Sequence, residues 1–452
     1  MIDNQTPVER AILVGAPDRS TPEHEADEHM EELRRLTDTA GGEVVAVVRQ
    51  RISSPSPSLY IGKGKAEEVA SAVTLSKADL VIFDEDLSPV QGSNLEKALG
   101  VRVMDRAELI LDIFATRARS REARLQVELA QLEYLLPRLK RMWTHLSRIR
   151  GGIGLRGPGE TQLETDRRLI RRRIADLRGK LRSVTAARAT QRKSREGRFR
   201  AALVGYTNAG KSSLLRALSG ADLFIEDRLF ATLDSATRTV DLGGGHEALV
   251  TDTVGFIRKL PHHLVASFRS TLEEAREADV LLLVIDAAHP DWEDHLAVVR
   301  EVLDELELLD RPQALVFNQI DRLTGEELDA LRARVRAFEP YPSIFVSAVT
   351  PGGVDSLLAS LRAGALTRFE HVEIDLPAAD GRTLATVYRD GEVFGQVARD
   401  GRVVLNARMP QAVLGRLRKI DDVVVRAGKP DAVAVASEEA SEEEDQLSEE
   451  RP

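Results

Sequence analysis

An eight-residue stretch, GYTNAGKS at 205–212, has the residue types and spacing that bind the phosphates of a nucleotide. It fits the pattern G-x-x-x-x-G-K-[ST], follows an apolar run and precedes a helix-forming one. Gly205 and Gly210 allow a tight turn, so that backbone amides face the phosphates. Lys211 is expected to reach the β- and γ-phosphates, and Ser212 to ligate Mg²⁺. The other loop residues expected to contact the nucleotide are Tyr206, Thr207, Asn208, Ala209 and Ser213.

A second segment, DTVGF at 252–256, supplies groups for the metal and the terminal phosphate. Asp252 is placed to hold Mg²⁺ through water, and the amide of Gly255 can meet the γ-phosphate. Thr232 precedes Asp252 by 20 residues, where a threonine that senses Mg²⁺ and the γ-phosphate is expected, and Thr237 is a weaker candidate. The predicted metal ligands are therefore Ser212, Thr232 and Asp252, and the predicted catalytic residues are Lys211, Thr232 and Gly255.

Two later segments predict recognition of guanine. FNQID (317–321) contains an Asn-x-x-Asp pair, Asn318 and Asp321, that suits guanine, because the Asp carboxylate can accept from the N1 and N2 donors of the base, which adenine does not present. In VSAV (346–349), the amide of Ala348 can meet guanine O6. Each motif alone is weak, but their order after a phosphate loop makes them reinforce one another. Gln319 and Ser347 complete the predicted base site.

The elements around these motifs predict an α/β chain with several domains, as its length of 452 residues also suggests. Short apolar runs at 11–15, 44–48, 80–84 and 101–105 alternate with helical patterns, which predicts a small parallel α/β domain over 1–116. The same rhythm returns over 197–365 and predicts a doubly wound sheet. Residues 366–430 predict a small C-terminal α+β domain, and the acidic residues 431–452 a disordered tail.

A long antiparallel helical hairpin is predicted over 117–196. Two sets of apolar residues step by four and three, as in heptads. The first set is Leu125, Leu129, Leu132, Leu136, Leu139, Trp143 and Leu146, and the second is Ile170, Ile174, Leu177, Leu181 and Val184. A glycine-rich loop, RGGIGLRGPGE at 150–160, joins them. Heptads could also serve oligomerisation, but that would explain neither the loop nor its charge, and we expect a monomer.

Charge is segregated along the chain, although its net value is −10. Residues 117–200 hold about 24 lysines and arginines against about 8 acids, which is typical of a polyanion-binding surface but also of a solvated helical face. The tail 437–450 holds about 8 acids and no base. The chain has no cysteine and an N-terminus without an apolar signal segment, so we expect a cytoplasmic protein without disulfides or thiolate metal sites.

The glycine-rich loop is interpreted as an RNA probe. It follows no strand and lacks the G-K-[ST] ending, so it is not a second phosphate loop. A linker would not need its charged residues, and a plain hairpin turn remains the alternative. Glycines allow close approach to phosphates and 2′-hydroxyls, and arginines pair with phosphate or stack on bases. The candidate RNA-binding residues are Arg150, Gly151, Gly152, Gly154, Arg156, Gly157 and Gly159.

These motifs resemble the HflX family of ribosome-associated GTPases, within the translation-factor class of P-loop GTPases. The resemblance covers residues ~10–365 and includes YIGKGKAEEV (60–69), FDEDLSPVQGSNLE (83–96), LILDIFATRARSREARLQVELAQLEYLLPRL (109–139) and GGIGLRGPGETQLETDRR (151–168). It implies an N-terminal domain and hairpin that engage ribosomal RNA, a P-loop GTPase domain, and binding to the large ribosomal subunit. It further implies a role in splitting stalled or idle ribosomes under stress.

Four positions bear on how closely the chain follows this pattern. Gln319 replaces the usual lysine of Asn-Lys-x-Asp, and Val349 that of Ser-Ala-Lys, which weakens the expected discrimination against ATP. Phe256 stands where many GTPases carry a water-orienting glutamine, which predicts slow hydrolysis without a partner. Asn208 could help to hold a K⁺ ion, as in some related GTPases. An ATP-driven RNA remodeller and a nucleotide-gated scaffold with negligible turnover remain alternative functions.

Overall fold

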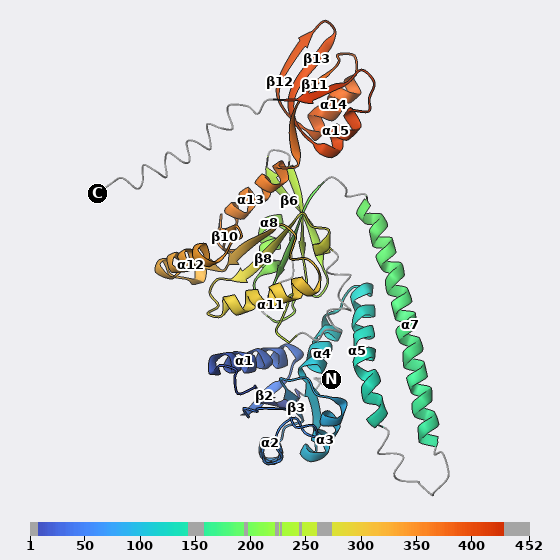
Figure 1. Cartoon of the computed structure of the whole chain (residues 1–452), viewed down its shortest axis with the longest axis vertical. Helices are drawn as coiled ribbons and strands as arrows, with labels where there is room; N and C mark the ends of the chain where they lie inside the picture. Colours follow the sequence, from blue (N-terminus) through green and yellow to red (C-terminus); the bar gives the residue numbers. More distant parts are fainter. Residues whose placement is uncertain are drawn as a thin grey trace, which may run out of the picture. The chain divides into compact units, whose positions relative to one another are not determined.

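A four-stranded parallel sheet forms the N-terminal part of the computed structural model, which describes residues 8–142, 158–193, 198–221, 226, 228–243, 246–259 and 274–428 (Figure 1). The strands are β1 (Arg10–Gly15), β2 (Glu43–Arg49), β3 (Leu80–Phe83) and β4 (Arg102–Asp105), in the order β2-β1-β3-β4. The helices are α1 (Glu23–Ala40), α2 (Lys63–Ser76), α3 (Pro89–Leu99) and α4 (Arg106–Arg117). Successive side chains of β1 and β3 enter two different cores, one with α1 and α4 and one with α2 and α3.

Local sequence explains where two of these helices begin. Ser88 caps α3 through a capping box with Gln91, and Pro89 occupies the first helical position, where a missing N–H costs nothing. Asp105 ends β4 and caps α4 by accepting from the amide of Glu108 at 2.9 Å. The strand-to-helix connection between β4 and α4 is therefore immediate, because one residue serves both elements.

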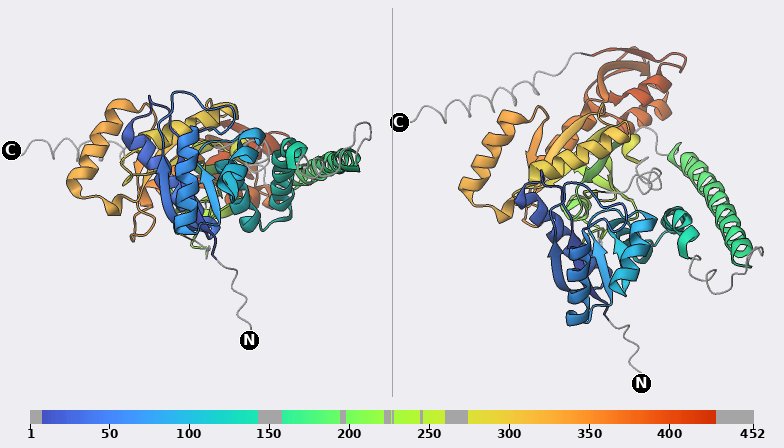
Figure 2. Two further views of the ribbon diagram at one scale, coloured as in Figure 1. Left: turned by 90° about the horizontal axis from the view of Figure 1, so that it is seen from below. Right: turned by 60° about the horizontal axis from the view of Figure 1, so that its bottom comes forward.

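Two long helices follow as an antiparallel hairpin. They are α5 (Arg121–Met142) and α7 (Pro158–Lys193), and each view shows α7 as one uninterrupted helix (Figures 1 and 2). Leu129, Ile174 and Leu177 form the buried seam between them, as the heptad pattern predicts. Trp143 and Leu146 lie outside the described residues, and so does the loop 150–157. The loop was predicted over 150–160, but α7 begins at Pro158, so residues 158–160 are helical.

A six-stranded sheet carries the sequence motifs. It contains β5 (Phe199–Gly205), β6 (Ala236–Gly243), β7 (His246–Asp252), β8 (Val280–Asp286), β9 (Gln313–Asn318) and β10 (Ser343–Phe345), in the order β10-β9-β8-β5-β7-β6. Its helices are α8 (Lys211–Ser219), α11 (Trp292–Glu305), α12 (Gly325–Phe338) and α13 (Asp355–Leu366), with a 3₁₀ turn at Ile320–Arg322. The chain leaves β5 for strands on one side and later returns to the other, so β5 ends at a topological switch point, where such sheets bind ligands.

The last described part of the chain is a four-stranded antiparallel sheet with two helices. Its elements run β11 (Phe369–Pro377), α14 (Gly381–Asp390), β12 (Glu392–Arg399), β13 (Arg402–Pro410), α15 (Gln411–Leu417) and β14 (Val424–Ala427), with the strand order β12-β13-β11-β14. This βαββαβ order is that of a ferredoxin-like fold. Alternate residues of β11 and β13, such as Ile374 and Leu405, pack with Val387 and Leu414 of the helices. The fold class is α/β, with a helical hairpin between the two parallel-stranded parts and this smaller α+β part after them.

Candidate nucleotide-binding site

The predicted phosphate loop lies between β5 and α8, and its backbone is tightly curled. Asn208 and Gly210 have positive φ angles of 62° and 88°. A Cβ atom at Gly210 would lie 2.2 Å from Nδ2 of the Asn318 side chain, so a side chain there would displace that of Asn318 as well as strain the backbone. A Cβ at Gly205 would lie 2.3 Å from the carbonyl oxygen of Val284. Close packing therefore requires glycine at 205, and both the contact and the positive φ favour it at 210.

Lys211 is held inside this loop. Its side chain is buried, and Nζ donates to the carbonyl oxygens of Gly205 at 3.1 Å and Tyr206 at 2.8 Å. Burial lowers the pKa of Lys211 to about 8, although the nearby carboxylate of Asp252 opposes the shift. The charged form of this buried amine is stabilised strongly by a phosphate, because phosphate oxygens replace the water that the ammonium group lacks.

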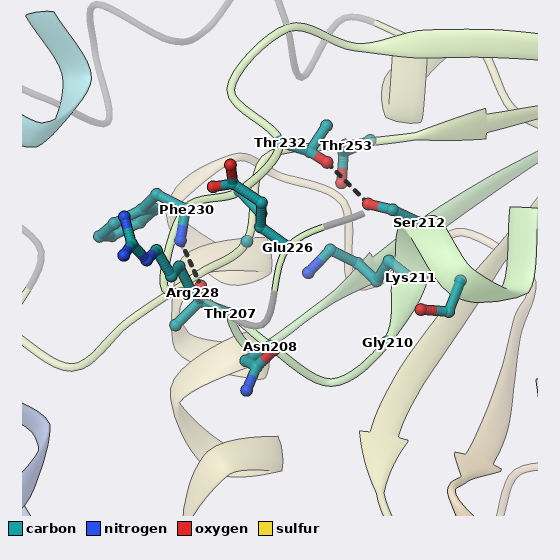
Figure 3. A pocket seen from close by; sticks show the side chains of 13 residues that line it. Thr207, Asn208, Gly210, Lys211, Ser212, Glu226, Arg228, Phe230, Thr232 and Thr253 are labelled. Carbon is teal, nitrogen blue, oxygen red and sulfur yellow. Dashed lines mark hydrogen bonds between the residues drawn. The ribbon is translucent and has the colours of Figure 1, made fainter. Parts of the chain in front are cut away.

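Three predicted metal ligands lie together beside Lys211. The hydroxyl of Ser212 donates to Asp252 Oδ2 at 2.6 Å and lies 2.7 Å from Thr232 Oγ1 (Figure 3). The other oxygen of Asp252, Oδ1, is buried and has no hydrogen-bond partner within the described residues. Burial raises the pKa of Asp252. Two hydroxyls and a carboxylate with a partnerless oxygen suit a hard divalent cation such as Mg²⁺.

The structure separates the two candidate threonines. Thr232 contacts Ser212, whereas Thr237 lies on β6 and its hydroxyl is 2.9 Å from that of Thr251 on β7. Thr237 is therefore part of the sheet. Figure 3 shows the hydroxyls of Thr232 and Ser212 directed at each other beside the phosphate loop.

The segment after Asp252 is joined to the phosphate loop by backbone hydrogen bonds. The amide of Phe256 donates to the carbonyl of Gly205 at 3.0 Å, and the amide of Thr207 donates to the carbonyl of Phe256 at 2.6 Å. A Cβ at Gly255 would lie 2.7 Å from the Cα of Thr207, so only glycine fits this approach. The Phe256 ring is 2% exposed and packs in the core, so it offers the site no group that orients water.

The predicted base-recognition residues meet at the ends of β9 and β10. The side-chain amide of Asn318 donates to the carbonyl of Ala209 at 3.1 Å, and its oxygen accepts from the amide of Ala348 at 3.2 Å. Ser347 donates to Asp321 Oδ1 at 2.6 Å. One cavity is lined both by the phosphate loop and by Asn318, Gln319, Asp321 and Ala348.

Gln319 and Val349 replace the lysines of the usual base-recognition motifs. Gln319 contacts a neighbouring residue, and Val349 is exposed. Gln319 has a φ angle of 66°, and its side-chain oxygen accepts from Arg322 at 2.7 Å. Val349 is 75% exposed and also lines the cavity. Both positions border the base region, so their side chains can influence how tightly a base is covered.

Sequence analysis missed the contacts that Tyr206 makes outside the phosphate loop. Its hydroxyl donates to the carboxylate of Glu32 on α1 and accepts from the amide of Arg258 at 3.0 Å. Its ring stacks on His295, with centroids 3.8 Å apart and planes at 6°. Glu32 lies 174 residues from Tyr206 in the chain, and no local pattern predicts such a pair.

Glu32, in the middle of α1, belongs to a buried ionic cluster beside the end of β3. Arg106 is 1% exposed, pairs with Glu32 and donates to Asp84 Oδ1 at 2.7 Å. Lys259, three residues after Phe256, pairs with the other oxygen of Asp84. Burial lowers the pKa of Arg106 to about 10. Unpaired buried charges are costly, so this cluster holds the segment after Phe256 in one position.

A neighbouring group, Glu28, His289 and His295, has the residue types of a transition-metal site. Its members already contact one another and Arg258. Glu28 Oε1 lies 2.9 Å from His295 Nε2 and 3.9 Å from His289 Nε2, while its Oε2 lies 2.9 Å from an Arg258 nitrogen. The amide of Asp291 donates to His289 Nδ1 at 3.2 Å, which places the proton of the neutral ring on Nε2, facing Glu28. The group is therefore a hydrogen-bonded cluster.

Most of the predicted RNA-binding residues lie outside the part of the chain that the structure describes. These are Arg150, Gly151, Gly152, Gly154, Arg156 and Gly157. Gly159 lies in the first turn of α7, directly after Pro158. Proline at that position is common in helices, because the first amide needs no partner within the helix.

A doubly wound sheet with this phosphate loop, base site and hydroxyl–carboxylate cluster defines a P-loop GTPase. Three family descriptions match the chain: "GTP-binding GTPase N-terminal" over residues 27–115, "GTP-binding GTPase Middle Region" over 117–195 and "50S ribosome-binding GTPase" over 200–319. Within the described residues, no helix combines the length and apolar character needed to cross a membrane.

Relatives identify the family. GTPase HflX of Magnetococcus marinus is 44% identical over 92% of this chain and 96% of its own, and GTPase HflX of Escherichia coli is 42% identical over 88% and 93%. A GTP-binding protein of Sulfolobus solfataricus, solved with GDP, is 26% identical and covers 80% of this chain and 99% of its own, but its TM-score of 0.43 establishes no shared arrangement of parts. The chain belongs to the GTPase HflX family, and its activity is the hydrolysis of GTP.

Proposed function

We propose that this GTPase acts on the large ribosomal subunit, where its helical hairpin engages ribosomal RNA and helps to separate stalled or idle ribosomes under stress. The observation that carries the proposal is the union of a GTPase site with a long basic hairpin in one chain. The matching description "50S ribosome-binding GTPase" and the family relationship support the choice of partner.

The hairpin presents a stripe of positive charge. Arg168, Arg171, Arg178 and Arg182 are exposed on α7 and recur at helical spacing, and Arg178 also pairs with Glu133 of α5. Exposed arginines in a row favour a polyanion, because they pair with phosphates and stack on bases. The 36 residues of α7 rise about 54 Å, which is enough to reach into a folded RNA.

In the proposed mechanism, the residues at the nucleotide site have separate tasks. Lys211 binds the β- and γ-phosphates, and the amide of Gly255 meets the γ-phosphate. Asp321, Ser347 and Ala348 hold guanine, with Asn318 fixing their loop. The remaining residues of the phosphate loop, namely Gly205, Tyr206, Thr207, Asn208, Ala209, Gly210 and Ser213, shape its backbone around the phosphates.

Ser212, Thr232 and Asp252 would hold Mg²⁺, for which the partnerless Asp252 Oδ1 is the best-suited acceptor among the described residues. When bound there, the ion would neutralise charge on the β- and γ-phosphates. The buried Phe256 leaves water without an orienting side chain at that position, so we expect basal turnover of roughly 10⁻⁴–10⁻² s⁻¹, raised on the ribosome.

K⁺ is a second candidate ion, with Asn208 as its proposed ligand. The main chain of Asn208 is in the left-handed region, which fixes the loop in which it lies. Hydrolysis measured in matched KCl and NaCl tests the idea: a dependence on K⁺ that is lost in Asn208→Ala supports it, and equal rates in both salts reject it.

Phosphate release from GTP and from ATP, each with and without purified large subunits, tests the proposed function. Strong stimulation of GTP hydrolysis supports it. Equal or better ATP turnover, stimulated by any structured RNA, would favour an RNA remodeller. Gln319 and Val349 are the reason to test this alternative, because they replace the lysines of the usual guanine-recognition motifs. Replacing residues 151–159 with a short serine-rich turn tests the hairpin: we expect the stimulated rate to fall toward the basal rate, and undiminished stimulation would reject the RNA-probe role.

A further inference from the structure

Asp234 connects the loop that carries Thr232 to the start of the hairpin. Its Oδ2 accepts from the backbone amides of Arg119 and Ser120, each at 3.0 Å, and its Oδ1 accepts from the Ser120 hydroxyl. The same hydroxyl accepts from the amide of Ala123 at 3.0 Å, so Ser120 caps α5. Asp234 lies 114 residues away in sequence, yet it satisfies amides at this helix end and places a negative charge where the helix dipole favours one.

The other end of the same short segment contacts the nucleotide site. Thr232 Oγ1 lies 2.7 Å from the Ser212 hydroxyl, and the amide of Phe230 donates to Thr207 Oγ1 at 2.9 Å (Figure 3). Two residues of chain span at most about 7 Å, so a shift of Thr232 by a few ångströms must move or break the contacts of Asp234. The segment 230–234 is therefore attached to the phosphate loop at one end and to α5 at the other.

Two further contacts hold this region to the junction of α4 and α5. The buried rings of Phe230 and Phe114 meet edge to face, with centroids 4.7 Å apart. Arg117, the last residue of α4, forms an ion pair with Glu226. A packed aromatic pair and an ion pair resist gradual sliding, so a displacement of the loop is passed to the junction.

We infer that Asp234 is a positioning residue that sets the place of Thr232 from the start of α5 and thereby couples the nucleotide site to the hairpin. The inference rests on the proposed role of Thr232 at the metal and γ-phosphate. Coupling of this kind is reciprocal: nucleotide that fixes Thr232 stabilises the capped start of α5, and a partner that shifts α5 alters the place of Thr232. The hairpin thus has a direct route to the rate of hydrolysis.

Steady-state kinetics of Asp234→Ala and Asp234→Asn give the first test, without ribosomes. We expect kcat to fall about tenfold in the alanine variant, while KM for GTP stays within about threefold, because the phosphate loop and base site are untouched. The asparagine variant should be intermediate, because its carbonyl oxygen still accepts from the amides. The control is Asp310→Asn, an exposed acid of the GTPase domain, which should behave as the unchanged protein. An unchanged kcat, or equal loss of kcat and affinity, would overturn the inference.

Hydrogen exchange of the amides at 119–124 gives a readout that a merely structural role would not produce. In the unchanged protein, we expect their exchange to differ between GDP and a non-hydrolysable GTP analogue. In Asp234→Ala that difference should vanish at 119–124 but persist at 228–233. A difference that survives at 119–124, or none in the unchanged protein, rejects the inference. If the alanine variant does not fold, as judged by its melting temperature, the asparagine variant carries the same test.

The two proposals fail in distinguishable ways. If large subunits do not stimulate the unchanged protein but Asp234→Ala still lowers kcat and removes the exchange difference, the ribosomal role fails and the coupling stands. If subunits stimulate the unchanged protein and Asp234→Ala equally, and the exchange difference survives, the coupling fails and the ribosomal role stands.

Discussion

The hydroxyl of Tyr206 accepts a hydrogen bond from the amide of Arg258 at 3.0 Å, and this contact ties the phosphate loop to the segment that follows Gly255. The same hydroxyl donates to the carboxylate of Glu32. One buried oxygen therefore holds two segments of the GTPase domain and one helix of the N-terminal sheet. Because Tyr206 lies inside the phosphate loop, these contacts restrain the loop itself, and their strength is measurable by removing a single atom.

Tyr206→Phe removes that oxygen. We expect the free energy of unfolding to fall by about 1–3 kcal/mol, because the Arg258 amide and the Glu32 carboxylate lose a buried partner. Urea unfolding measures the loss. Tyr388→Phe is the matched control: Tyr388 is 50% exposed and its hydroxyl donates to Gln396 at 2.5 Å, so its loss should be below about 0.5 kcal/mol. Equal losses in both variants would show that the buried contacts of Tyr206 contribute no more to the free energy of unfolding than the exposed contact of Tyr388.

Lys211→Ala should abolish nucleotide binding. The amine is buried inside the loop and bonded to two loop carbonyls, a position that Arg228, the other cation among the described residues lining the pocket, does not share. Fluorescence titration with a labelled GTP measures the affinity. Lys97→Ala, at an exposed position on α3, is the control and should bind normally. Normal binding by Lys211→Ala would refute the assignment of the site.

Nucleotide binding should take up a proton at alkaline pH. The pKa of Lys211 is about 8 before nucleotide binds, so the amine is mostly protonated at pH 7 and mostly neutral at pH 9. Bound phosphates favour the ammonium form and raise this pKa. Calorimetry in two buffers of different ionisation enthalpy should show uptake at pH 9 well above that at pH 7. Lys211→Arg, which stays charged at both pH values, is the control, and an equal uptake in that variant would assign the proton to another group.

Thr232→Ala should lower kcat at least tenfold, because it removes a hydroxyl beside the Ser212 and Asp252 oxygens that we assign to the metal. Thr237→Ala deletes the same atoms from β6, where the hydroxyl contacts that of Thr251 in the sheet, and kcat should stay within about twofold. GTP hydrolysis at saturating nucleotide compares the two. A larger effect of Thr237→Ala would reverse the assignment.

Asp321→Asn should change which base is bound. The carboxylate that accepts from guanine N1 and N2 becomes an amide, which can donate to the 2-oxygen of xanthine. We expect affinity for GTP to fall at least tenfold and affinity for xanthosine triphosphate to rise. Competition between the two nucleotides measures the change. Asp329→Asn, at an exposed position on α12, is the control and should keep its preference for GTP.

Sequence patterns predicted most of the strands and the phosphate loop, because both depend largely on neighbours in the chain. β5, β8 and β9 are nearly continuous apolar runs, and Gly210 has a positive φ angle of 88°. β6, which has more polar residues, was not predicted. The α+β class of the C-terminal part was predicted, but the positions of α14 and α15 were not, since 10 and 7 residues of mixed composition between strands carry little periodicity. The strand order of the six-stranded sheet was not predicted either, because apolar runs do not specify which strands become neighbours.

Long-range polar contacts were beyond the reach of such patterns. Ser120 and Asp234 are ordinary residues in their own segments, and only the fold brings the carboxylate to the helix end. The pairing of Tyr206 with Glu32 likewise depends on how α1 packs. A buried hydrogen bond between distant segments has no periodicity, so its prediction requires the tertiary structure.

The side chain of Asn318 joins the two ends of the nucleotide cavity, since it donates to Ala209 and accepts from Ala348. The phosphate loop and the guanine loop are thus two parts of one mechanical unit. Ordering either loop also orders the other. Once one loop has bound its half of the ligand, the other loop therefore loses less conformational entropy when it binds the second half. Guanosine and inorganic pyrophosphate should therefore each bind more tightly when the other is present, and the chain distinguishes an intact nucleotide from either fragment by cooperation between its halves.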